Sequence, residues 1–160
     1  MREDLHGDVN PRPLPPPAIR RCTQADVAWM AGVAHRRYPG EFDLKSAVAW
    51  AAQQVNNPQM VFIRGDRSFG VAHLARRFNA PSRVQAYLTL LYAEPGTTLP
   101  LEPFRVVEAL VAWAREQGAT KFWLSDISGC DLGPFAKRLG GREAGHTYVI
   151  DLDDEGTRYG

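Results

Sequence analysis

The sequence predicts an α+β domain, a mixed sheet with helices on both of its faces. Between residues 60 and 93, three strand-like segments follow one another with only turns between them, which is typical of an antiparallel meander. The segment 87–118 then reads as strand, loop and helix, and a further strand-like segment follows, which indicates one parallel, right-handed crossover. Two amphipathic segments precede the meander. The expected order is therefore β-α-α-β-β-β-α-β-α-β.

Length and composition indicate one globular domain. The chain has 160 residues, of which 44% are hydrophobic and 23% charged. A net charge of +1 argues against strong non-specific attraction to nucleic acid or to a membrane. Cys22 and Cys130 are too few for a disulfide framework, so both are expected as reduced thiols. No apolar signal region is seen, and we expect a protein that is not secreted through a signal peptide.

The ends of the chain are expected to lie outside the domain, which spans residues 18–152. Residues 1–17 have little to bury and form a Pro-rich extended arm, whereas 153–160 form a polar C-terminal tail. Within the segment Asn10–Pro17 of this arm, polyproline II character is expected from Pro11 onward, and Arg12–Pro17 matches the basic-plus-PxxP pattern that aromatic grooves bind. The same composition also fits a stiff, solvated arm. We expect a protein partner at this segment, in a homo- or hetero-oligomeric assembly.

Two helices are expected after a short first strand at 18–22. Thr23 with Asp26 three residues later forms a capping box, and Asp43 caps the second helix, which runs from 44 to about 55. Helical spacing places the following residues on the inner faces: Val27, Met30, Ala31 and Ala34 in the first helix; Leu44, Ala47, Val48 and Ala51 in the second.

The second half of the chain supplies the rest of the sheet. Strands are expected at 60–63, 68–78, 84–93, 121–127 and 146–152, and a short helix at 134–139. The crossover helix covers 102–117, and its inner face is formed by Phe104, Val107, Val111 and Ala114. Trp123 and Leu124 should both be largely buried, because helices are expected on both faces of their strand.

Three phrases in this order, LYAEP, EQGATKFWLSD and FAKRLGG, resemble the GNAT superfamily of N-acetyltransferases. The resemblance extends from about Ile19 to Leu152. It implies that the fourth strand and the following loop hold acetyl-coenzyme A, with small residues that let backbone amides approach a pyrophosphate. On that reading, Leu91, Ala93, Thr97 and Thr98 hold the cofactor if it binds.

The same region departs from the family pattern. Gly96 is the only glycine of the loop, and Pro100 and Pro103 each lack the N–H that a phosphate needs. Glu102 adds a negative charge at the start of the crossover helix. The tyrosine that often serves as the family's acid aligns with Ala136.

Candidate catalytic residues are few. No inward carboxylate is identified on 84–93, which leaves His73, Tyr87 and Tyr92, with Thr89 beside them. A lone histidine in a strand is also typical of a satisfied core or rim residue. No metal site is predicted.

Three functions remain open. The first is a catalytically degenerate GNAT-fold protein that needs no cofactor and acts as a binding or structural component, for which the family resemblance suggests a bacteriophage particle. The second is an active acetyl-CoA-dependent N-acetyltransferase of unknown acceptor, in which an amine attacks the thioester directly. The third, nucleic-acid binding through scattered arginines such as Arg76 and Arg77 near Phe78, is disfavoured by the balanced charge. The protein is accordingly expected in the cytoplasm or in a virus particle.

Overall fold

The computed structural model describes residues 18–40, 43–97, 101–125 and 131–145. In chain order the elements are β1 (Arg20–Arg21), a 3-10 turn (Gln24–Asp26), α1 (Val27–Arg37), α2 (Leu44–Gln54), β2 (Met60–Arg64), β3 (Ser68–Arg77), β4 (Ala80–Ala93), α3 (Leu101–Glu116), β5 (Phe122–Trp123) and α4 (Gly133–Arg138). The expected last strand at 146–152, the arm 1–17 and the tail 153–160 lie outside the described residues. All other expected elements are present in the expected order.

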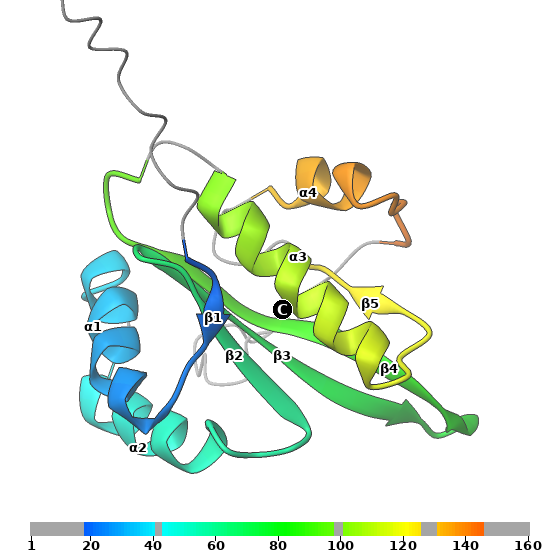
Figure 1. Cartoon of the computed structure of the whole chain (residues 1–160), viewed down its shortest axis with the longest axis horizontal. Helices are drawn as coiled ribbons and strands as arrows, with labels where there is room; N and C mark the ends of the chain where they lie inside the picture. The colour runs from blue at the N-terminus through cyan, green and yellow to red at the C-terminus, as the bar shows by residue number, and fades with distance from the viewer. Residues whose placement is uncertain (1–17, 41–42, 98–100, 126–130, 146–160) are drawn as a thin grey trace, which may run out of the picture.

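One mixed sheet runs through the described chain in the order β1-β2-β3-β4-β5. The first four strands pair antiparallel, whereas β5 lies parallel to β4 (Figure 1). The long β3–β4 hairpin extends past the helices at one end of the molecule. The parallel pair is joined through α3, as the predicted crossover requires.

Each face of the sheet carries its own apolar core. Helix α3 packs on one face, where Val106 and Leu110 are fully buried against Ala72 and Ala86. Gly70 permits this close approach, because a Cβ atom there would lie 2.9 Å from Leu110 Cδ1. The predicted inner face of α3 is confirmed: Phe104, Val107, Val111 and Ala114 are all buried.

Helices α1 and α2 cover part of the opposite face. Their core contains Met30, Val33, Phe62 and Val71, all of them buried. Thr23 begins this region as predicted, since its backbone N–H donates to Asp26 Oδ2 over 2.8 Å. A 3-10 turn, which is wound more tightly than an α-helix, follows Thr23 and leads into α1.

Two predictions about burial are wrong. Leu44 is 42% exposed, because the first turn of α2 extends beyond the sheet and only Ala51 of that helix is buried. Trp123 and Leu124 are half-buried rather than largely buried. The reason is that β5 is two residues long rather than seven, and it lies at the edge of the sheet away from α1 and α2 (Figure 1).

Candidate functional site

The candidate site is the edge of β4 that faces β5, together with the loop leading into α3. Strands β4 and β5 pair only through Ala86 with Phe122 and Tyr87 with Trp123. The C-terminal half of β4, residues 88–93, therefore has no strand partner on this edge among the described residues. Within this half, Thr89 is an extra residue, since Leu90 pairs with Val71 and Leu88 with Ala72. The bulge leaves Thr89 without a residue opposite it on β3.

The first turn of α3 is tied to the sheet by Glu102. Its Oε1 accepts a 2.7 Å hydrogen bond from the backbone N–H of Arg67 and another of 2.7 Å from Ser68 Oγ. The carboxylate also lies over Gly65, where a Cβ atom would come within 2.5 Å of Glu102 Cδ. A carboxylate thus occupies the start of a helix, where an anionic ligand would otherwise be favoured.

The other end of the loop carries a second held carboxylate. Arg36 at the end of α1 donates from Nε to Glu94 Oε2 over 3.0 Å, and this contact lowers the pKa of Glu94. The backbone N–H of Glu94 donates to the carbonyl of Arg67 over 2.7 Å. Both ends of the β4–α3 loop are therefore fixed to the turn between β2 and β3.

The cofactor candidates lie at the end of β4 and in the turn that follows it. Leu91 packs against the α3 core, and Ala93 pairs with Ser68 of β3. Thr97 belongs to a turn in which its N–H donates to the carbonyl of Glu94 over 3.2 Å, and its buried Oγ has no hydrogen-bond partner. Thr98 lies outside the described residues.

Two of the three catalytic candidates are neighbours. His73 and Tyr87 stack with ring centroids 5.3 Å apart, and His73 Nδ1 lies 2.7 Å from Thr89 Oγ1. Burial lowers the pKa of His73, which favours the neutral ring at pH 7. Tyr92 instead packs between Tyr38 and Phe69, and burial raises its pKa. The structure therefore separates Tyr92 from the other two.

Gln85 was missed by sequence reasoning. It is buried in β4, and its Oε1 accepts hydrogen bonds from Trp123 Nε1 over 2.8 Å and from the Tyr87 hydroxyl over 3.2 Å. Tyr87 and Trp123 are stacked as well, with centroids 6.3 Å apart, so a row of three rings crosses β3, β4 and β5. The available signal in the sequence was an amide side chain within a strand rich in apolar residues, because a buried amide needs hydrogen-bond partners.

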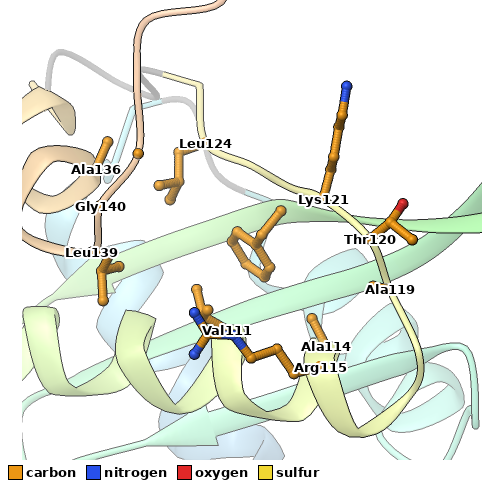
Figure 2. Close-up of a pocket in the computed structure, with 12 residues that line it drawn as sticks. Val111, Ala114, Arg115, Ala119, Thr120, Lys121, Leu124, Ala136, Leu139 and Gly140 are labelled. Carbon is orange, nitrogen blue, oxygen red and sulfur yellow. The ribbon is translucent and has the colours of Figure 1, made fainter.

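A pocket of about 220 Å³ lies elsewhere, between the C-terminal half of α3, β5 and α4 (Figure 2). Ala136, Leu124 and Val111 line it, with Arg115 and Lys121 at its border. None of the predicted catalytic or cofactor residues lines it, and neither does Glu102. Ala136 places a methyl group where the family resemblance would put an acid.

Two features are absent from the described ranges. No three side chains among histidine, cysteine, aspartate and glutamate come together as a metal site. No helix there is long and apolar enough to cross a membrane.

Comparison with known proteins shows similarity in structure but none in sequence families. No model of a known protein family matches the chain, and no curated protein matches it. Among solved structures, a predicted acetyltransferase with acetyl-CoA from Clostridium acetobutylicum has a TM-score of 0.69 at 15% identity and covers 88% of this chain and 99% of its own. A Trypanosoma brucei acetyltransferase has a TM-score of 0.68 at 14% identity and covers 85% of this chain and 99% of its own.

Not every similar structure bears the name of an enzyme. A transcriptional regulator from Bacillus halodurans has a TM-score of 0.71 at 12% identity and covers 85% of this chain and 99% of its own. Identities this low establish the fold alone. The chain has the GNAT-like fold, a mixed five-stranded sheet with four α-helices in its described part.

Proposed function

We propose that this chain is a GNAT-fold protein that does not catalyse acetyl transfer and acts as a binding or assembly component. The observation that carries the proposal is the carboxylate of Glu102, held at the start of α3 by Ser68 Oγ and the Arg67 N–H. A coenzyme A pyrophosphate needs several N–H donors at this position and is repelled by a fixed negative charge.

The loop chemistry supports the same conclusion. Pro100 and Pro103 have no N–H, and even two lost charge-assisted hydrogen bonds, at about 1.5–3 kcal/mol each, weaken binding by roughly two to four orders of magnitude. Ala136 supplies no proton to a departing thiolate. Fold alone does not imply the family's activity.

The partner in this proposal is another protein, bound through Asn10–Pro17. The segment is rich in proline and has almost no apolar side chains to bury within its own domain. Deletion of residues 1–17 is expected to leave the melting temperature almost unchanged and to abolish assembly. A bacteriophage particle as the setting remains a prediction.

Calorimetry with acetyl-CoA and with coenzyme A tests the proposal. With about 10 µM protein and about 100 µM ligand, we expect no heat of binding. We also expect no shift of the melting temperature. The variant Glu102→Gln isolates the effect of the negative charge on cofactor binding, since it removes the charge and keeps an acceptor oxygen. A micromolar dissociation constant for the unmodified chain contradicts the proposal.

The second candidate function is acetyl-CoA-dependent N-acetyltransfer. The edge of β4 at 88–93, which has no strand partner among the described residues, and the neutral His73 beside Tyr87 support it. In that case the backbone would hold the pantetheine arm, and His73 would accept the proton of the amine that attacks the thioester. Release of coenzyme A thiol from acetyl-CoA in the presence of amine acceptors, lost in His73→Gln, would favour this function over the first.

A further inference from the structure

Positive charge gathers at one end of the sheet, around the end of the β3–β4 hairpin and the start of β5. Arg77 of β3 pairs with Ala80 at the end of the β3–β4 hairpin, Arg83 lies in the stretch of β4 that follows without a partner on β3, and Lys121 directly precedes β5. The Arg77 Cζ and the Lys121 Nζ lie 5.3 and 5.7 Å from the Trp123 ring centroid. We call these three cations, Trp123 and the neighbouring Phe78 the hairpin surface.

Within the described residues, the cations of the hairpin surface have no acidic partner. The ion pairs of the described chain involve Arg20, Arg36, Arg64 and Arg105, and none of them involves Arg77, Arg83 or Lys121. A cation held over an aromatic ring keeps its full charge, whereas one beside a carboxylate is neutralised. The row of rings therefore positions Arg77 and Lys121 and leaves them free to bind an anion.

Phe78 provides the apolar part of the surface. It lies in the turn between β3 and β4 and is 103% exposed, against 38–47% for the other exposed large hydrophobic residues of the described chain. Gln85 accepts hydrogen bonds from Tyr87 and Trp123, which fixes the Trp123 ring of the same surface. A fully exposed ring beside unpaired arginines offers its face to a planar group.

We propose that the hairpin surface binds single-stranded nucleic acid, with phosphates on Arg77, Arg83 and Lys121 and a base stacked on Phe78. Guanidinium groups match phosphate geometry, and stacking on an aromatic side chain works with any base. An acidic protein segment would satisfy the cations but would leave the Phe78 ring in water. The overall charge of +1 excludes only strong attraction by the whole molecule, and a local cluster of three cations predicts modest, salt-sensitive affinity.

Fluorescence anisotropy of a labelled single-stranded DNA 15-mer, titrated with the full chain at 50 mM and 150 mM salt, tests the proposal. The wild type is expected to bind, and affinity should fall as salt rises, with a slope of about −0.7 for each phosphate neutralised. Arg77→Gln with Arg83→Gln should weaken binding at least about tenfold and reduce the magnitude of that slope by about 1.4. Phe78→Ser should weaken binding several-fold and leave the slope unchanged.

Arg21→Gln with Arg142→Gln is the matched control, because it removes the same charge from exposed positions elsewhere. This control should bind the DNA like the wild type. All variants should have the melting temperature of the wild type, because their replaced side chains are exposed. Absence of wild-type binding up to about 100 µM, equal loss in the control, or tighter binding of a polyglutamate peptide than of the DNA would overturn the proposal.

Discussion

Glu102 and Ser68, 34 residues apart in the sequence, share a 2.7 Å hydrogen bond that joins α3 to the beginning of β3. Ser68 is completely buried, and the same carboxylate oxygen also accepts from the Arg67 N–H. The contact thus stabilises the fold and at the same time places a negative charge where a GNAT cofactor loop would need donors.

Gly65→Ala should destabilise the protein by about 1–3 kcal/mol, because the new methyl group overlaps Glu102 and displaces it from Ser68. Denaturant unfolding measures the loss. In the background of Glu102→Ala the same substitution should cost almost nothing, so the double-mutant cycle should show strong coupling. Additive effects of the two substitutions would contradict the contact.

Acid should remove the contribution of Asp26. This buried carboxylate accepts from Arg20 and Arg64, and the Arg20 hydrogen bond holds the pKa of Asp26 well below its usual range. Because the folded-state pKa lies below the unfolded value of about 3.9, the ionised carboxylate stabilises the fold above that pH. This stabilisation is lost as the pH falls toward the folded-state pKa. Asp26→Asn should therefore cost about 2 kcal/mol at pH 7, and its difference from the wild type should shrink below about pH 4.

Unfolding free energies of both proteins between pH 2.5 and 7 measure this difference. The pKa of Glu94 is lowered too, but this residue is present in both proteins and its effect cancels. A gap that stays constant over this range would show that Asp26 does not titrate as its contacts predict.

Val107→Asp should cost several kcal/mol, because Val107 is fully buried on the inner face of α3 and the new carboxylate would have no partner. Ala112→Asp is the matched control on the exposed face of the same helix. Thermal melting distinguishes the two. Variants that melt at the same temperature would mean that the helix face is assigned wrongly.

Cys22 should be unreactive in the folded protein. The thiol is buried, and burial is the main reason that its pKa is raised to about 12. In a chain carrying Cys130→Ser, a disulfide reagent at pH 8 should modify Cys22 only as denaturant unfolds the domain. Rapid modification of the native protein at low reagent concentration would be inconsistent with this environment.

Local sequence patterns determined most of the elements. Thr23 with Asp26, and Asp43 before the second helix, are caps whose chemistry acts over three residues. The spacing of Phe104, Val107, Val111 and Ala114 identified the buried face of α3, because helix geometry alone fixes which residues share a side. Short connections and one long crossover then determined the strand order.

The site, by contrast, depended on contacts between distant segments. Ser68 and Glu102, Arg36 and Glu94, and Gln85 with Trp123 lie 34, 58 and 38 residues apart, and nothing in either member of a pair indicates the other. His73, Tyr87 and Tyr92 were all candidates from the sequence, but the register pairs Tyr87 with His73 and Tyr92 with Phe69, which lies four residues away along β3. Tyr92 packs there against Tyr38, the residue that follows α1. Within one helix or strand, the side on which a residue lies follows from the periodicity of that element. Contacts between elements depend instead on strand register and on the part of the sheet that each helix covers. These relationships exist only once the chain is folded.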